Sequence, residues 1–385
     1  MPLTRILGVS LLRGRKTPGY YLWFLAIRDW ILILFLGRSR RISLENLRKR
    51  RIVVSKIDHL GDLLMISPFL LEIKRQLQQV EIILVTGSWN EPVAQMLREG
   101  GMCDVVCHYD APALNRSTSG YFRRLGRFIR SFLITRSQLL RERPDIFVDL
   151  RPFSPNTLLL ARLCRIPFRV GFGLRGLSFT LQRVIPYDEK ISVGQLYLNA
   201  LPLLGLRGAR YEKPFLGMQR GRDSRTPVSG ARAEPYILFQ PTSGEISREI
   251  PSEIWDQILD VLCSHFKVLA VGSAADQPRI DRFAHGRQRR VFESVAGRTN
   301  IREALEYAKG SAGCIGVDSL FAHVGIAFDL PVCVLGVRGI SQRASYPEDN
   351  PNLFFVNVDS EDFSAWKVGS EFVQRVVAHR VDIRT

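Results

Sequence analysis

Two aspartates and a histidine follow directly after a short apolar segment near the start of the chain. Residues 52–75 read IVVSKIDHLGDLLMISPFLLEIKR, and Asp58, His59 and Asp62 lie where the β-branched run gives way to an apolar helical pattern. A carboxylate at this position can serve as a general base that removes a proton from a substrate. It can equally cap the helix by accepting hydrogen bonds from free backbone N–H groups. The spacing alone leaves both interpretations open.

A second polar group follows an apolar segment in GVDSLFAHVGIA, residues 316–327. Asp318 and Ser319 precede an expected helix, whose free backbone N–H groups are suited to binding a diphosphate. Helix capping explains the same two residues equally well. His323 lies in the first turns of this helix, where a histidine is more often packed and hydrogen-bonded than catalytic.

A third polar group, FQPTSGEISREIP at residues 239–251, also follows an apolar segment. Thr242, Ser243 and Arg248 combine small hydroxyl side chains with a guanidinium, a combination that binds phosphate oxygens. A surface loop with an incidental arginine has the same composition. The sequence therefore offers three polar segments, each at the end of an expected strand.

Short apolar segments alternate with helical patterns along most of the chain. In the first half we expect strands at residues 51–55, 81–85, 104–108 and 145–150, with helices at 63–78, 91–99 and 121–142. In the second half we expect strands at residues 236–240, 267–273, 291–297, 312–317 and 331–336, again with helices between them. This alternation indicates parallel sheets covered by helices. In such sheets ligands bind at the carboxyl ends of the strands, which is where the polar segments lie.

The chain of 385 residues is longer than one ordinary hydrophobic core requires. Residues 217–235 are rich in Gly, Ser, Pro and Arg without an apolar period and are expected to form a linker. We therefore expect two doubly wound Rossmann-like domains, at 51–216 and 236–360, that face a cleft. A helical, basic and hydrophobic extension at 1–50 precedes them, and a helix within 361–385 is expected to pack back on the first domain.

The extension contains a hydrophobic segment, GYYLWFLAIRDWILILFLG at residues 19–37, close to the length of a membrane-spanning helix. Arg28 and Asp29 lie in its middle, and one charge near the centre of a spanning helix costs about 2.5–3.5 kcal/mol on insertion scales. Basic residues flank the segment on both sides, which disfavours crossing and favours lying on the anionic cytoplasmic surface of a membrane. Packing on the globular body and a true span are the alternatives.

An arginine-rich helix is expected at residues 121–136, YFRRLGRFIRSFLITR. Phe122, Leu125, Ile129 and Phe132 are expected on one face that packs on the core, with the arginines elsewhere. The basic side is either simply solvated or contacts an anionic lipid or a phosphorylated acceptor.

The formal net charge of +17 favours anionic partners. No nucleic-acid recognition motif and no run of interleaved basic and aromatic residues accompanies this charge, so nucleic acid is not expected as a partner. The six cysteines are scattered, without a CxxC pair or histidines at zinc spacing. We expect reduced thiols of a cytoplasmic protein and no metal site.

In combination and in this order, the three polar segments resemble glycosyltransferase family 9, the heptosyltransferases that build the lipopolysaccharide core. KIDHLGD (56–62) is similar to the first-strand motif of that family, and Ser67-Pro68 to a Ser/Thr-Pro pair in the helix that follows. VDSLFAHVGIAFDLPVCVLG (317–336) resembles its donor-site motif, and QPTSGEISREIPSEIW (240–255) resembles its segment with a cation before a proline and a tryptophan.

The resemblance, which extends from Arg51 to Arg338, implies a GT-B fold and sugar transfer with inversion, without a metal or another cofactor. Residues 51–216 would bind the acceptor, an anionic glycolipid of the lipopolysaccharide core or a related envelope glycolipid, and residues 236–360 the nucleotide-sugar donor. ADP-heptose is the first donor implied, and the inner face of the bacterial cytoplasmic membrane is the implied location, with peripheral association.

The resemblance also assigns roles to single residues, with Asp62 as the general base that deprotonates the acceptor hydroxyl. The implied donor-binding residues are Thr242, Ser243, Arg248, Asp318, Ser319, Leu320 and His323. The implied acceptor-side or supporting residues are Lys56, Asp58 and Gly61.

Four residues depart from the family pattern. Leu320 stands where the family has a glycine after Asp-Ser, Val337 and Arg338 stand where members usually read Pro-Thr, and Arg248 stands where a lysine is common. These departures leave the fold expectation intact and the sugar open. The alternatives to a transferase are a catalytically degenerate relative that binds glycolipid or nucleotide without turnover, and a sugar epimerase on a similar two-domain scaffold.

Overall fold

The computed structural model describes residues 27–34, 51–112, 114, 120–152, 156–174, 176–217, 234–244, 248–337, 345–347 and 349–382. The chain divides into two compact units, unit 1 up to Tyr211 and unit 2 from Glu212. Most of the extension expected at 1–50, and most of the linker expected at 217–235, lie outside the described residues.

Unit 1 is built on a parallel six-stranded sheet in the order β3-β2-β1-β4-β5-β6. Its strands are β1 (Arg51–Ser55), β2 (Glu81–Thr86), β3 (Val105–His108), β4 (Ile146–Asp149), β5 (Phe168–Gly171) and β6 (Arg183–Val184). β1 lies between β2 and β4, with Ser55 opposite Val85 and Asp149. The strand order therefore changes direction between β1 and β4, the point where open α/β sheets bind ligands.

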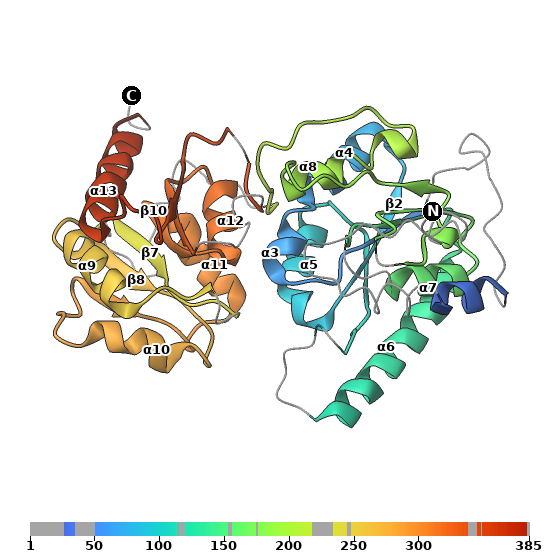
Figure 1. Cartoon of the computed structure of the whole chain (residues 1–385), viewed down its shortest axis with the longest axis horizontal. Coiled ribbons are helices and arrows are strands. Elements are labelled where there is room, and N and C mark those ends of the chain that lie inside the picture. The colour runs from blue at the N-terminus through green and yellow to red at the C-terminus, as the bar shows by residue number, and fades with distance from the viewer. Residues whose placement is uncertain are drawn as a thin grey trace. The chain divides into compact units, whose positions relative to one another are not determined.

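Helices cover both faces of the unit 1 sheet (Figure 1). They are α3 (Leu60–Leu64), α4 (Ser67–Gln76), α5 (Glu91–Glu99), α6 (Tyr121–Glu142), α7 (Asn156–Leu163) and α8 (Val193–Leu198). On one face, side chains of β1, β2 and β4 pack against α6 and α7. The β-branched residues of β1 are fully buried, which explains why the strand pattern was readable in the sequence.

The single helix expected at residues 63–78 is in fact two helices, α3 and α4, with a break before Ser67. Pro68 has no backbone N–H, and in a continuous helix its ring would clash with the carbonyl of Leu64, four residues earlier. The hydroxyl of Ser67 donates to that carbonyl instead, at 2.7 Å. The break thus separates the short α3, which carries Asp62, from α4.

Residues 27–34, within the hydrophobic segment of the extension, form a helix that packs on unit 1. Asp29 is fully buried, and its carboxylate accepts hydrogen bonds from the backbone N–H of Leu177 at 2.6 Å and from Arg28 at 2.7 Å. Burial raises the pKa of Asp29 above its ordinary value, although Arg28 opposes this effect. Among the described residues no helix is long and apolar enough to cross a bilayer.

Unit 2 is built on a second parallel six-stranded sheet, in the order β12-β11-β10-β7-β8-β9. Its strands are β7 (Tyr236–Gln240), β8 (Lys267–Ala270), β9 (Phe292–Ser294), β10 (Gly313–Val317), β11 (Val332–Gly336) and β12 (Leu353–Asn357). Numbered along the chain within each unit, both sheets follow the order 3-2-1-4-5-6 of a Rossmann fold. The predicted fold class, two doubly wound Rossmann-like units, is confirmed.

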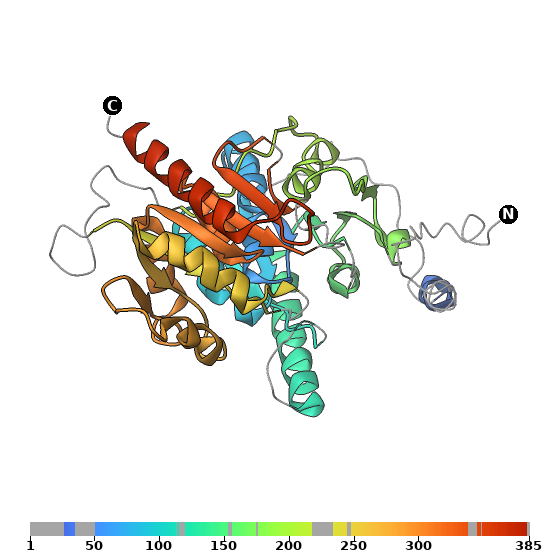
Figure 2. The same cartoon turned by 60° about the vertical axis from the view of Figure 1, so that its left-hand side comes forward.

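The helices of unit 2 are α9 (Ser252–Cys263), α10 (Gln277–Asp281), α11 (Ile301–Gly310), α12 (Leu320–Ala327) and α13 (Ala365–Asp382). The C-terminal helix was expected to pack back on the first domain, which stays a prediction; within unit 2, α13 packs beside α9 (Figure 1, Figure 2). Phe372 and Val376 enter the core formed by α9 and the sheet, which accounts for this position.

Candidate active site

Lys56 is a buried cation at the carboxyl end of β1. Its ammonium lies 2.7 Å from Oδ2 of Asp58, and it donates to the hydroxyl of Tyr197 at 2.7 Å and to the carbonyl of Leu150 at 3.3 Å. Burial alone would lower the pKa of Lys56, but the neighbouring carboxylates and the Tyr197 hydroxyl raise it above its ordinary value. Lys56 therefore stays charged and ties together the ends of β1 and β4 and helix α8.

Asp58 is held from two sides. Its Oδ1 accepts from Nε of Arg151 at 2.6 Å, opposite the contact with Lys56. Burial would raise the pKa of Asp58, but these two cations hold it below its ordinary range. The backbone carbonyl of Asp58 accepts from Nε1 of Trp89 at 2.7 Å and from Nδ2 of Asn90 at 2.9 Å. Both carboxylate oxygens of Asp58 thus face cations, and its backbone carbonyl anchors the loop.

Arg151 is itself positioned by Asp149, the last residue of β4. The buried carboxylate of Asp149 accepts from the backbone N–H of Arg151 at 3.1 Å and from the hydroxyl of Thr157 at 2.9 Å. Burial raises the pKa of Asp149 to about 7. Through these hydrogen bonds Asp149 and Thr157 fix the backbone at Arg151.

Asp62 differs from Asp58 in its exposure. It is the third residue of α3, whose N-cap is His59, so the helix-capping interpretation of Asp62 does not hold. Its Oδ1 lies 3.9 Å from the Lys56 ammonium, and 37% of its side chain is exposed, compared with 16% for Asp58. Gly61 precedes it in the same turn. Of the two carboxylates, Asp62 is the one that a substrate hydroxyl can approach.

In unit 2, Asp318 at the end of β10 organises a second polar cluster. Its Oδ2 accepts from Nη1 of Arg248 at 2.7 Å, and its Oδ1 accepts from the hydroxyl of Tyr346 at 2.5 Å. Tyr346 is fully buried and stacks on the ring of His323, with centroids 4.7 Å apart. Burial, followed by the charge of Asp318, raises the pKa of Tyr346 well above its ordinary value. The cluster holds the Arg248 guanidinium, whose side chain is 34% exposed, at the switch point of the sheet.

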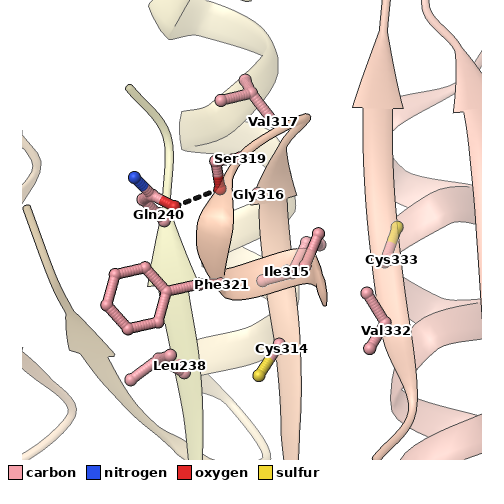
Figure 3. Close-up of a pocket in the computed structure, with 11 residues that line it drawn as sticks. Leu238, Gln240, Cys314, Ile315, Gly316, Val317, Ser319, Phe321, Val332 and Cys333 are labelled. Atoms are coloured by element: carbon pink, nitrogen blue, oxygen red, sulfur yellow. Dashed lines mark hydrogen bonds between the residues drawn. The ribbon is translucent and has the colours of Figure 1, made fainter. Parts of the chain in front are cut away.

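The turn from β10 into α12 is joined to the end of β7. The hydroxyl of Ser319 donates to the side-chain oxygen of Gln240, as Figure 3 shows. Gly316 allows this close approach, because a Cβ at that position would lie 2.2 Å from the Gln240 carbonyl oxygen. The space beneath the turn is lined mainly by apolar side chains, whereas the backbone N–H groups that begin α12 are of the kind that binds anions.

Thr242 and Ser243 follow β7 at the same edge of the sheet. Thr242 is buried, and its hydroxyl has no hydrogen-bond partner within the described part of the chain. It borders a hollow of about 320 Å³ that is also lined by Trp255, Arg279 and Arg282. Ser243 is partly exposed, as is Leu320 at the start of α12.

Both sets of site residues predicted from the sequence lie at the switch point of their own sheet. Lys56, Asp58 and Asp62 follow β1 in unit 1, and the residues of the second and third polar segments follow β7 and β10 in unit 2. Sequence reasoning missed five residues that hold these sites: Asp149, Arg151, Tyr197, Gln240 and Tyr346. Asp149 and Arg151 could have been found, since they end an expected strand next to β1, whereas Tyr197 and Tyr346 carry no signal in the sequence.

This chain shares its two doubly wound units with glycosyltransferases of known structure. The model of glycosyltransferase family 9 (heptosyltransferase) matches residues 147–346, more than half of the chain. The chain therefore belongs to glycosyltransferase family 9. The matched residues begin in β4, so the segment with Asp62 lies before them.

A curated relative is lipopolysaccharide heptosyltransferase 1 of Pseudomonas aeruginosa, 25% identical over 117 residues, which cover 30% of this chain and 32% of the relative. The match thus spans about a third of that relative's length.

Solved structures are similar over most of their length. A family 9 glycosyl transferase from Veillonella parvula has a TM-score of 0.68 at 16% identity, covering 89% of this chain and 99% of its own. ADP-heptose lipopolysaccharide heptosyltransferase II of E. coli has a TM-score of 0.67 at 15% identity, covering 86% and 99%. The E. coli heptosyltransferase WaaC, solved with ADP, has a TM-score of 0.67 at 14% identity, covering 84% and 99%. At these identities the similarity shows the fold.

Proposed function

We propose that the protein is an inverting glycosyltransferase that moves a sugar from a nucleoside diphosphate donor to a glycolipid acceptor, with Asp62 as the general base. The observation that carries the proposal is the unequal pair of carboxylates after β1. Asp58 is locked between Lys56 and Arg151, whereas Asp62 remains exposed in the same turn. Membership of family 9 supports the reaction class.

In the proposed reaction, Asp62 accepts the proton of the acceptor hydroxyl while that oxygen attacks the anomeric carbon of the donor. A new C–O bond forms, and the bond between the anomeric carbon and the diphosphate oxygen breaks, with its electron pair remaining on the diphosphate. Attack opposite the departing diphosphate inverts the anomeric configuration. General-base catalysis of this kind typically contributes about 10²- to 10⁴-fold to the rate.

The departing diphosphate needs positive charge and hydrogen-bond donors as the bond breaks. In unit 2 the Arg248 guanidinium and the backbone N–H groups at the start of α12, at Ser319 and Leu320, supply them. Asp318 orients Arg248 through the 2.7 Å ion pair, and Tyr346 in turn fixes Asp318. Thr242, Ser243 and His323 complete the proposed donor side, and no metal is required in this scheme.

ADP-heptose is the first donor to test, because the similar E. coli structures carry the names of heptosyltransferases and one was solved with ADP. A lipopolysaccharide-core or related envelope glycolipid is the proposed acceptor. The net charge of +17 supports an anionic acceptor and a place at the inner face of the cytoplasmic membrane.

Release of nucleoside diphosphate from a panel of nucleotide sugars, with and without cell-envelope glycolipid, tests the proposal. We expect release that depends on the glycolipid and on one donor, and product analysis by NMR should show the inverted anomer. Arg248→Gln should lower the turnover rate, with Arg289→Gln, an arginine in an exposed ion pair, as the control. Absence of release from every donor by folded protein would contradict the proposal.

The second candidate is a relative that binds nucleotide or glycolipid without turnover. It is favoured by Leu320, which stands where the family has a glycine and is partly exposed at the start of α12. In that case the donor would bind without release, and Leu320→Gly would restore turnover.

A further inference from the structure

The helix at residues 27–34 presents its apolar side chains to solvent. Its charged residue Asp29 is fully buried, whereas Ile27, Trp30, Ile31 and Leu34 are between 43% and 64% exposed. These four residues are spaced i, i+3, i+4 and i+7, so they form one stripe along the helix. A helix on the surface of a soluble protein normally has the opposite arrangement, with the apolar stripe facing the core.

Helix α6 carries a second exposed apolar stripe. Phe122, Ile129, Leu133 and Leu140 are between 37% and 85% exposed, and their spacings of about two, one and two helical turns keep them on one side of the helix. The core-facing side of α6 is formed by a different set, Phe128, Phe132 and Leu139. The expectation that Phe122 and Ile129 pack on the core together with Phe132 is therefore wrong.

Arginines border the stripe of α6. Arg123, Arg130 and Arg141 are exposed, and each directly follows a residue of the stripe, so it lies about 100° around the helix from that residue. Guanidinium groups beside an apolar stripe match the layered chemistry of a membrane surface, where lipid phosphates lie above the acyl chains.

Both helices belong to the same layer of unit 1. Leu32 on the first helix, and Phe128 and Phe132 on α6, pack against one core cluster that also contains Leu158 and Ala161 of α7. In both views α7 lies between α6 and the helix at 27–34 (Figure 1, Figure 2). The two helices that carry the exposed stripes thus lie over the same face of the unit 1 sheet.

We propose that these two stripes and the arginines beside α6, together called the stripe surface, dock on a bilayer that contains anionic phospholipids. The apolar side chains enter the boundary between headgroups and acyl chains, with Trp30 at the level where interfacial tryptophans lie. Arg123, Arg130 and Arg141 bind lipid phosphates. Charge complementarity selects this occupant over a neutral protein surface, since apolar contact alone would not require arginines beside three of the four stripe residues of α6.

Co-sedimentation of the full chain with vesicles tests the proposal. We compare vesicles of phosphatidylcholine alone with vesicles that also contain phosphatidylglycerol, and expect binding to the anionic vesicles that weakens as salt is added. Each arginine near an anionic surface contributes about fivefold to the affinity, so the triple variant Arg123→Gln/Arg130→Gln/Arg141→Gln should bind about 100-fold more weakly. Phe122→Ser/Leu133→Ser should weaken binding to both kinds of vesicle.

Trp366→Ser is the matched control, because Trp366 is a 65% exposed tryptophan on α13 of unit 2 and should leave vesicle binding unchanged. A local readout comes from lipids with brominated acyl chains, which should quench the fluorescence of the wild type more than that of Trp30→Phe. Circular dichroism establishes that each variant is folded, and nucleotide release in detergent reports the proposed transferase separately from docking.

The proposal is overturned if the wild type stays in the supernatant with anionic vesicles, or if the stripe variants bind as the wild type does. Light scattering tests the alternative occupant, a second copy of the chain. If the wild type is a dimer, and the stripe variants are monomers that bind vesicles as the wild type does, the stripes form an interface between copies of the chain.

Discussion

Replacement of the buried lysine should be the most damaging single change in unit 1. Lys56→Met removes the cation that contacts Asp58 at 2.7 Å, while Arg151 remains at the other carboxylate oxygen. The substitution also leaves the Tyr197 hydroxyl and the Leu150 carbonyl without the donor they now have. Methionine fills a similar volume, so little of the effect comes from packing.

Removal of one partner from a buried ion pair lowers the free energy of unfolding by about 3–5 kcal/mol, because the other charge stays buried without compensation. The Lys56 side chain is only 2% exposed, but Asp58 keeps its ion pair with Arg151, so we expect the lower end of this range, about 3 kcal/mol. Lys74→Met is the matched control: Lys74 forms an ion pair of the same kind with Asp104 at 2.6 Å, but both side chains are partly exposed, and exposed pairs contribute about 0–1 kcal/mol.

Hydrogen exchange followed by mass spectrometry measures this effect within unit 1, since peptides from β1 report the free energy of opening of that unit. We expect exchange from β1 to accelerate by about two orders of magnitude in Lys56→Met, and little in Lys74→Met. In a double-mutant cycle, Asp58→Asn should cost less in the Lys56→Met background than alone. Equal, small effects of the two lysine variants would refute the role assigned to Lys56.

Two further changes test the surroundings of the sites. Burial raises the pKa of Asp149 to about 7 from an ordinary value of 3.8, so the folded protein binds this proton more tightly than the unfolded chain does. Proton binding by Asp149 therefore adds to the free energy of unfolding at low pH, and this stabilisation is lost as the pH rises through about 7. Between pH about 4 and 7, the free energy of unfolding measured with urea should therefore fall less for Asp149→Asn than for the wild type. The difference between the two decreases should be at most about 4 kcal/mol. If the two proteins lose the same free energy over this pH range, the raised pKa of Asp149 is contradicted. Gly316→Ala places a Cβ 2.2 Å from the Gln240 carbonyl oxygen and should destabilise unit 2 by about 1–3 kcal/mol in thermal unfolding. Gly126→Ala is the control: a Cβ at this position on α6 would have no atom within 4 Å, so the change should be neutral or stabilising by up to about 1 kcal/mol. If Gly316→Ala were also neutral, β7 and β10 would have to be able to move apart.

The central strands of both sheets could be predicted from the sequence, because their residues are buried on both faces and read as short apolar runs. β12 (Leu353–Asn357) was not predicted, although the turn residues Asn350 and Pro351 come shortly before its apolar run; it is an edge strand whose residues are all only partly buried. The break between α3 and α4 was visible in Pro68 but was overlooked in favour of the apolar period.

The first residues of each site were predictable because catalytic groups in α/β sheets follow the strands. Their supporting partners were not, because these contacts join distant parts of the chain: Tyr197 lies 141 residues from Lys56, and Arg151 lies 93 residues from Asp58. The exposed stripe on α6 was hidden for another reason. Its helix is apolar on two sides, and periodicity alone cannot tell which of the two faces the core.

The measurement that tests the central claim most directly is the single-turnover rate of sugar transfer by Asp62→Asn, with donor affinity measured on the same protein. If Asp62 is the base, the rate should fall at least about 100-fold while donor affinity and the circular dichroism spectrum remain those of the wild type. A variant that transfers sugar at the wild-type rate would show that another group accepts the proton.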